Sequence, residues 1–168
     1  MPRFAHPLTW QLTNVDGDAP GPMRISMRAR VMAEVEDRTG TWRAIQFVID
    51  TGASFPIMRT GLAEALRLEV PHEALPISFT TADGRRASVV RDGELHLRFP
   101  QLLGQTFRLK CLFRDNQPAG VPPVLGLHNT LDLLGIRFDG TTMPALGPAH
   151  PEDGFMGYVE FTTRDGST

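Results

Sequence analysis

The chain has 168 residues, of which 41% are hydrophobic and 21% charged, and this is the composition of one ordinary globular domain rather than of a disordered chain. Its 17 basic and 19 acidic residues give a net charge of −2, so there is no electrostatic reason to expect nucleic acid or an anionic membrane as a partner. No 18-residue apolar stretch predicts a membrane span. The single cysteine, Cys111, excludes an internal disulfide, and residues 1–20 lack the apolar core of a signal peptide, so we expect a cytoplasmic protein.

Alternation of apolar and polar residues in the first part of the chain predicts strands. Residues 7–13 read as a half-buried strand, and glycines and prolines end it. Residues 23–36 and 42–50 alternate on either side of the turn sequence "DRTGT" and predict a long hairpin. Residues 60–68 have the first helical spacing, with Thr60 as a possible N-cap.

The second half of the chain continues in the same way. The sequence "ADGR" lies between two β-rich arms and predicts a tight hairpin over residues 75–90. Further strands are predicted at 94–99, 106–113, 136–140 and 157–164, and a second short helix at 128–134. The chain is therefore predicted to be mainly β with one or two short helices.

One stretch, "FVIDTGAS" at residues 47–54, carries the chemistry. An apolar strand ends at Asp50, and Gly52 lets the backbone approach the carboxylate without a Cβ in the way. A carboxylate in a partly dry place is costly unless it is paired or has chemistry to perform. The structural alternative is an aspartate at a strand end that begins an Asx-turn, which is a common feature.

The flanks of this stretch resemble the active-site signature of the aspartic peptidases. "FVIDTGASFPI" matches the first signature, "PVLGLHNTLDLLGIRF" matches the second, and the hairpin "ISFTTADGRRASVV" lies between them where the family has its flap. The order and spacing resemble the retropepsin family, the single-domain relatives that include retroviral proteases. The resemblance covers about residues 23–139. It implies a single-domain, closed β-barrel-like acid-protease fold with a flap hairpin, preceded by an extension at 1–22 and followed by another at 140–168, each with a possible strand.

The resemblance also assigns roles to residues. Asp50 would be the catalytic residue, Thr51 would brace the loop against its counterpart in a second chain, and Gly52 would present its backbone to the substrate. Ala53 completes the motif without the hydrogen bond that a serine there can donate. The remaining implied positions are the flap tip, Ala82, Asp83 and Gly84, and the second motif, Val124, Leu125 and Gly126.

Aspartic peptidase chemistry, as the family implies it, needs two carboxylates that share one proton around a water molecule. The Asp-Thr-Gly triplet occurs once in this chain. We therefore expect a homodimer in which Asp50 of each copy contributes to one site. The expected substrate is a protein or peptide, and neither a cofactor nor a metal is expected.

Two features leave alternatives open. Retroviral relatives usually carry an aspartate at the place of Ser54 and an arginine at the place of Leu127, and these two pair; both are absent here. The terminal strands can interleave in a dimer, as in retroviral relatives, or can fold back and keep the chain monomeric. A catalytically silent peptide-binding or structural module on the same fold is therefore the second hypothesis.

Overall fold

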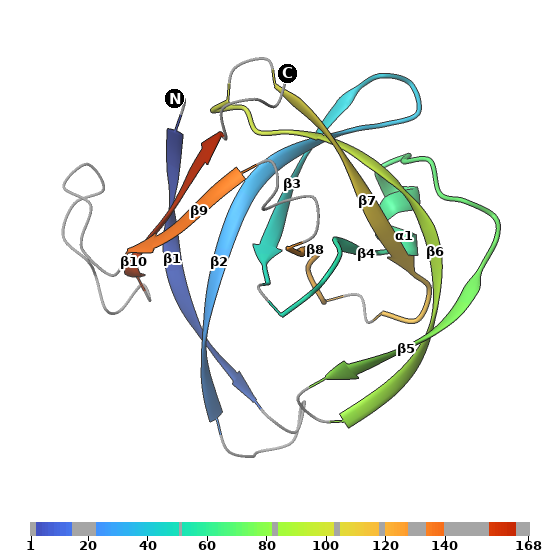
Figure 1. The fold of residues 1–168 in the computed structure, drawn as a ribbon, viewed down its shortest axis with the longest axis horizontal. Coiled ribbons are helices and arrows are strands. Elements are labelled where there is room, and N and C mark those ends of the chain that lie inside the picture. The colour runs from blue at the N-terminus through green and yellow to red at the C-terminus, as the bar shows by residue number, and fades with distance from the viewer. Residues whose placement is uncertain are drawn as a thin grey trace.

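The protein is described here from a computed structural model, which describes residues 3–14, 23–50, 52–81, 84–102, 105–117, 120–127, 134–139 and 155–163. Strands dominate these residues, so the mainly β class is confirmed (Figure 1). The strands are β1 (Arg3–Asn14), β2 (Met23–Glu36), β3 (Trp42–Ile49), β4 (Ile57–Arg59), β5 (Leu75–Thr81), β6 (Gly84–Arg98), β7 (Thr106–Arg114), β8 (Val124–Leu125), β9 (Leu134–Asp139) and β10 (Phe155–Thr163), and the helix is α1 (Thr60–Ala65). No helix among these residues is long and apolar enough to cross a bilayer.

The strands form one sheet with the order β5-β6-β7-β4-β8-β3-β2-β1-β10-β9. An additional pairing between β2 and β6 closes the middle of this sheet into a ring that runs through β2, β3, β8, β4, β7 and β6. The β3–β8 and β4–β7 pairings are parallel, and the other pairings are antiparallel. The apolar positions of the ring strands form most of the core, and their largest fully buried side chains include Phe47, Phe113, Met58 and Leu97.

Charged side chains support the closure between β2 and β6, which pair at Glu34 with Arg98 and at Val35 with Leu97. The Nε of Arg98 donates to Oε2 of Glu34 at 2.6 Å, and the guanidinium lies 4.3 Å from the ring centre of Trp42. These contacts join residues about sixty positions apart in the chain, so neither strand predicts them from its own sequence.

The predicted hairpin at residues 23–50 is confirmed as β2 and β3, which pair from Ala29 with Ile49 to Glu36 with Trp42. Its turn is organised by Asp37, whose side chain is fully buried. One carboxylate oxygen accepts hydrogen bonds from the backbone N–H of Thr39 at 2.9 Å, from its hydroxyl at 2.6 Å and from the N–H of Thr41 at 2.9 Å. Gly40 takes a positive φ of 80°, which a glycine adopts without steric cost.

Helix α1 is shorter than predicted, and the expected capping role of Thr60 is wrong. Arg59 occupies the N-cap position without a side-chain capping bond, and Thr60 is the first helical residue. The Thr60 hydroxyl instead donates to Asp115 at 2.7 Å. At the other end, Leu68 N–H bonds to Ala63 and Arg67 N–H to Glu64, which is a Schellman motif with Arg67 at the left-handed position (φ 60°).

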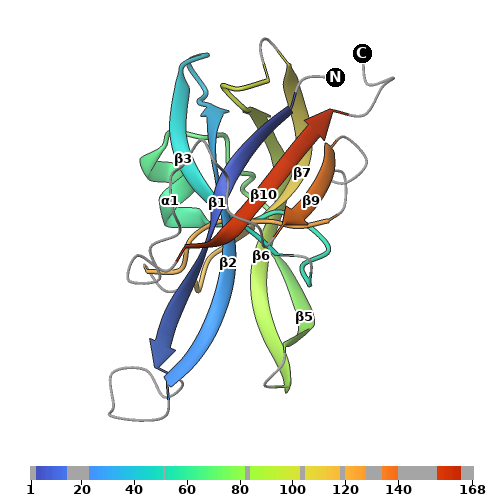
Figure 2. The ribbon, with the colours of Figure 1, turned by 90° about the vertical axis from the view of Figure 1, so that its left-hand side faces the viewer.

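Residues 157–163 of the strand predicted at 157–164 lie in β10, and residue 164 lies outside the described residues. β10 pairs with β1 inside the same chain, from Arg3 with Thr162 to Thr9 with Phe155. β1 also pairs with β2, and β10 with β9 (Figure 2). Of the second predicted helix, residues 128–133 lie outside the described residues, and Leu134 belongs to β9, so the helix was wrong at that residue. The division into extensions at 1–22 and 140–168 stays a prediction.

Two hairpins extend beyond the ring on the same side of the molecule (Figures 1 and 2). β2 pairs with β3 only from Ala29 onward, so residues 23–28 continue past the end of β3 and pair with β1. β6 pairs with β7 only from Val90 onward, so residues 84–89 continue past β7 and pair with β5. The end of β3, where Asp50 follows, lies between these two hairpins (Figure 1).

Candidate active site

Asp50 follows the last residue of β3 and its side chain is exposed. Its backbone N–H donates to the carbonyl of Leu125 at 3.1 Å, which fixes the end of β3 against β8. One carboxylate oxygen, Oδ1, accepts a hydrogen bond of 2.8 Å from the N–H of Gly52. Among the described residues no hydrogen bond to the other oxygen, Oδ2, is present. The local geometry is thus that of the Asx-turn considered from the sequence. This turn uses Oδ1 and leaves Oδ2 of Asp50 accessible for chemistry.

Small residues after Asp50 allow this tight turn. A Cβ at Gly52 would lie only 3.2 Å from Oδ1 of Asp50, so a side chain there would crowd the carboxylate. The N–H of Ala53 donates to the backbone carbonyl of Asp50 at 3.2 Å. Thr51 lies outside the described residues. The Gly52 N–H therefore orients the Asp50 carboxylate, and the Ala53 N–H closes the turn on the backbone carbonyl of Asp50.

The second motif lies directly beside the first. β8 pairs in parallel with β3, with Val124 opposite Val48 and Leu125 opposite Ile49. Gly126 is buried, and a Cβ there would lie 2.4 Å from the carbonyl oxygen of Phe55 and 2.7 Å from its nitrogen. Both contacts are to backbone, so only glycine fits without displacing the chain. The structure thus brings together the two motifs that lie about seventy residues apart in the sequence.

A backbone hydrogen bond from Leu127 links the second motif to the Asp50 loop. Retroviral relatives have a charged pair of side chains at this place. The N–H of Leu127 donates to the carbonyl of Ala53 at 2.9 Å. Ser54 is exposed and Leu127 is half-buried. Here a backbone hydrogen bond, rather than an ion pair between side chains, links the Asp50 loop to the second motif.

The predicted hairpin between the motifs is confirmed, with β5 and β6 paired from Leu75 with Val90 to Thr81 with Gly84. Gly84 is the first residue of β6. Ala82 and Asp83, which connect the two strands, lie outside the described residues. The structure therefore confirms the hairpin, and its role as a flap stays a prediction.

A hydrogen-bond network at the stem of this hairpin was missed by the sequence reasoning. Arg91 donates to both carboxylate oxygens of Asp115 at 3.1 Å each, and to the backbone carbonyls of Pro71 and His72. The hydrogen bond from Arg91 holds the pKa of the Asp115 carboxyl below its usual range, and the hydroxyl of Thr60 acts in the same direction. The partners lie 19 to 55 positions apart in the chain, so no local motif signals them.

Cys111 is buried in β7, and burial raises the pKa of its thiol to about 12. The thiolate is the nucleophilic form of cysteine, so this residue is packing rather than a nucleophile. Among the described residues no three His, Cys, Asp or Glu side chains come together as metal ligands.

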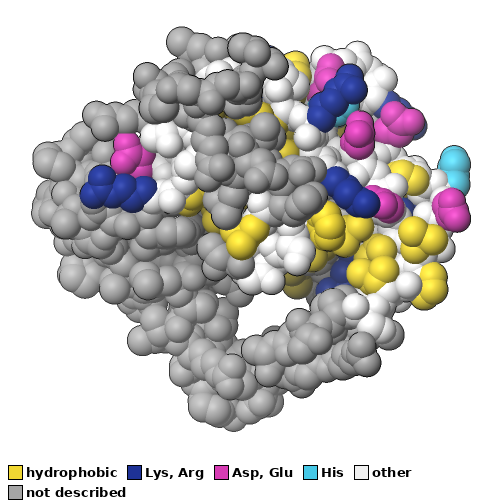
Figure 3. Space-filling view, viewed as in Figure 1, with side chains coloured by type: hydrophobic (Ala, Val, Ile, Leu, Met, Phe, Trp, Pro, Cys, Tyr) yellow, Lys and Arg dark blue, Asp and Glu magenta, His cyan; other side chains and the backbone are white. Residues whose placement is uncertain are grey.

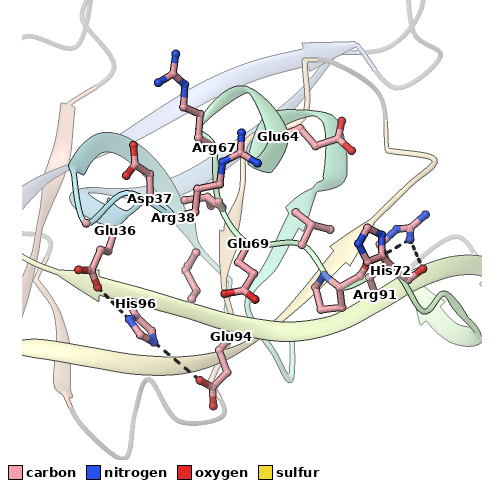
Figure 4. Close-up of a pocket in the computed structure, with 15 residues that line it drawn as sticks. Glu36, Asp37, Arg38, Glu64, Arg67, Glu69, His72, Arg91, Glu94 and His96 are labelled. Carbon is pink, nitrogen blue, oxygen red and sulfur yellow. Dashed lines mark hydrogen bonds and ion pairs between the residues drawn. The ribbon is translucent and has the colours of Figure 1, made fainter.

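A hollow of about 1110 Å³ lies beside the β2–β3 turn, the end of α1 and the middle of β6 (Figure 4), and residues of the Asp50 loop do not line it. Its walls carry charges of both signs, including Arg38 and Glu69, and the His96 ring lies between Glu36 and Glu94. Basic and acidic side chains are also intermingled on the described part of the face in Figure 3.

The fold and the Asp50 loop together define a class of protein by three features. The chain is mainly β, one exposed aspartate follows an inner strand and is oriented by backbone, and the parallel strand beside it is followed by a buried glycine. A family model described as "Aspartyl protease" matches residues 31–128, which is more than half of the chain and includes both motifs and the hairpin. The chain belongs to this aspartyl protease family, and the resemblance found in its sequence is confirmed.

Among solved structures, the chain is similar to the crystal structure of a retropepsin-like aspartic protease from Rickettsia conorii. The two share 16% sequence identity with a TM-score of 0.47, and the match covers 95% of this chain and 92% of the other. No curated protein matches the chain.

Proposed function

We propose that the protein is an aspartic endopeptidase that hydrolyses peptide bonds of an extended protein or peptide segment between the Asp50 carboxylates of a homodimer. The observation that carries this proposal is the Asp50 loop, in which Oδ1 is held by the Gly52 N–H at 2.8 Å and the carboxylate remains exposed. Membership of the aspartyl protease family supports the same activity.

The need for a second copy follows from the chemistry and from the sequence. The family's reaction uses two carboxylates, and this chain has one Asp-Thr-Gly triplet. At roughly 3 Å and an effective dielectric constant near 20, two ionised carboxylates repel by about 5 kcal/mol. The pair therefore shares one proton, so that one member is a neutral acid and the other an ionised base.

In the proposed reaction the ionised carboxylate takes a proton from a water molecule as its oxygen attacks the peptide carbonyl carbon. The neutral carboxylic acid gives its proton to the carbonyl oxygen, and a tetrahedral diol forms. Proton transfer to the peptide nitrogen then lets the C–N bond break, which releases an amine and a carboxylic acid. In each copy the Gly52 and Ala53 amides hold the Asp50 loop in shape, and Thr51 braces it against its counterpart, as the family resemblance implies.

The proposal assigns substrate binding to the space between Asp50 and the β5–β6 hairpin. This hairpin extends past β7, and its connection is Ala82–Asp83, with Gly84 on the β6 side. An extended peptide can add main-chain hydrogen bonds to such a hairpin as a strand adds to a sheet edge. The proposed reaction needs no cofactor, and we place it in the cytoplasm because the chain has one cysteine.

One observation favours the second hypothesis, a catalytically silent module. β1 and β10 pair with each other inside a single chain, so they do not have the arrangement in which terminal strands of two copies interleave. A homodimer of this chain must therefore bring the Asp50 loops together through other surfaces. A chain that stays monomeric would have the fold without the paired carboxylates.

Two measurements test the proposal. Wild-type protein is incubated with a peptide library, with and without pepstatin, and Asp50→Asn serves as the variant that lacks the essential carboxylate. Sedimentation at the same concentrations gives the mass in solution. The proposal predicts a dimer that cleaves, is inhibited by pepstatin and loses cleavage in the variant. A strict monomer without cleavage would support the silent module.

A further inference from the structure

Arg91 makes the largest set of side-chain hydrogen bonds at the stem of the β5–β6 hairpin, where Arg114 of β7 also donates to the hydroxyl of Ser88 at 2.8 Å. β6 joins the sheet at Val90, where its pairing with β7 begins, and Arg91 is the next residue. Beyond this point residues 84–89 pair with β5, and six residues of strand extend roughly 20 Å. A small change in the angle of the hairpin at its stem therefore produces a large displacement of the hairpin's far end, which lies beside the proposed substrate site.

Arg91 connects three other segments at this stem. Its Nε and Nη2 donate to the two oxygens of Asp115, at the end of β7, with 3.1 Å each. Its Nη1 donates to the carbonyls of Pro71 at 3.3 Å and His72 at 2.5 Å, in the segment that leads into β5 (Figure 4). Asp115 in turn accepts the hydroxyl of Thr60 at the start of α1. Guanidinium is suited to this role because its planar fork has five donors in fixed directions.

Close packing restricts the same segment. A Cβ at Gly93 would lie 2.9 Å from Cδ of Pro71 and 2.9 Å from Cε2 of Phe113. Pro71 therefore lies directly against β6 two residues beyond Arg91. The N–H of Asp115 also donates to the carbonyl of Val89 at 3.2 Å, so the end of β7 contacts the hairpin through backbone as well as side chain.

The stem is linked to the Asp50 loop through β4. This strand ends at Arg59, directly before Thr60, and it pairs in parallel with β7 from Ile57 with Leu112 to Arg59 with Arg114. Ile57 also pairs with Val124 of the second motif. The network around Arg91 thus includes Thr60, the residue that directly follows the strand leading away from the Asp50 loop.

We propose that Arg91 is a positioning residue, which sets the angle at which the β5–β6 hairpin leaves the sheet and hence how it closes over substrate at Asp50. The proposal rests on the proposed peptidase function for its effect on catalysis, and its effect on the hairpin is independent of that function. The side chains of Arg91 and Asp115 are 25% and 26% exposed, so the geometry of several hydrogen bonds, rather than an isolated buried charge pair, carries the effect.

The test compares Arg91→Lys and Asp115→Asn with the control Arg43→Lys. Arg43 also bonds an aspartate, Asp37, with its Nε and Nη2 at 3.1 Å, but at the β2–β3 turn. Lysine keeps the charge of Arg91 and cannot span the carboxylate and both carbonyls from one nitrogen. Amide hydrogen exchange is measured over residues 75–89 and over β7, and KM and kcat are measured for a cleaved peptide.

We expect both stem variants to raise exchange over residues 75–89 about tenfold and to raise KM about tenfold with a smaller change in kcat, while β7 exchange stays unchanged. Arg43→Lys should change neither quantity. Unchanged hairpin exchange in both stem variants would overturn the proposal, as would faster exchange with an unchanged KM. If the wild-type protein cleaves nothing, the peptidase proposal fails, and the exchange result alone decides whether Arg91 holds the hairpin.

Discussion

Gly126 is the position where the account of the site makes its sharpest prediction about stability. The perturbation is Gly126→Ala, which adds one methyl group at a buried residue of the second motif. This Cβ would lie 2.4 Å from the carbonyl oxygen of Phe55, 2.5 Å from its carbonyl carbon and 2.7 Å from its nitrogen. Because these atoms are backbone, the clash cannot be relieved by rotating a side chain.

The expected cost combines two effects. Overpacking a close-packed interior typically destabilises by about 1–3 kcal/mol. Separation of the two segments also weakens the Leu127–Ala53 hydrogen bond of 2.9 Å, which contributes about 1 kcal/mol. We therefore expect a loss of roughly 2–4 kcal/mol in the free energy of unfolding, from a total that is about 5–15 kcal/mol for a typical domain. The peptidase activity should fall as well, because Asp50 bonds to Leu125, the residue before Gly126.

Urea denaturation followed by circular dichroism measures this loss, and Gly120→Ala is the matched control. A Cβ at Gly120 meets nothing within 4 Å, so the control should change the free energy of unfolding by less than about 0.5 kcal/mol. If Gly126→Ala is as stable as the control, the close approach of the two motifs is not a constraint of the fold, and the reasoning is refuted.

Three further predictions follow from other parts of the structure. The hydroxyl of Thr39 and the other donors around Asp37 hold the pKa of its carboxyl well below the ordinary value of about 3.9, so Asp37→Asn should destabilise the protein at neutral pH. In urea titrations the difference in unfolding free energy between wild type and variant should shrink as the pH falls below about 4, because the native carboxylate is then losing its advantage over the unfolded one. A difference that does not change with pH would contradict this assignment. Burial raises the pKa of Cys111 to about 12, so a thiol reagent at pH 8 should label it only in unfolded protein, and rapid labelling of native protein would show that β7 opens. Arg67 has a φ of 60°, so Arg67→Gly should stabilise by about 1 kcal/mol in thermal unfolding, whereas a loss would mean that the arginine side chain contributes more than the strain costs.

Local patterns predicted most of the strands because alternation along a strand is a property of consecutive residues. The hairpins of residues 23–50 and 75–90 were both identifiable, since each has a turn sequence between alternating arms. The position of Asp50 at the end of an apolar strand was also readable from "FVIDTGAS". The Asp50 loop and the second motif could be placed together only through the family resemblance, because their contact joins residues about seventy positions apart.

The features that were missed depend on contacts distant in sequence. Thr60 has the residue type and position of an N-cap, but its hydroxyl bonds to Asp115, which a local pattern cannot reveal. β4 has only three residues, which is too few for alternation to be recognised in the sequence. It is a strand because it pairs in parallel with β7. Leu134 continued an apolar helical spacing, yet it pairs with Thr163 in β10, so tertiary pairing overrode the local preference.

The central claim is that a single chain supplies one essential carboxylate and that the catalyst is a pair of chains. Subunit mixing tests this directly: a fixed amount of wild-type protein is equilibrated with increasing amounts of Asp50→Asn, and cleavage of one peptide is followed. If two Asp50 carboxylates form the site, an equal amount of the variant should reduce the activity to about half, and an excess should abolish it, because wild-type chains are drawn into mixed dimers. Activity that stays constant at every ratio would mean that each chain works alone, and would contradict the account.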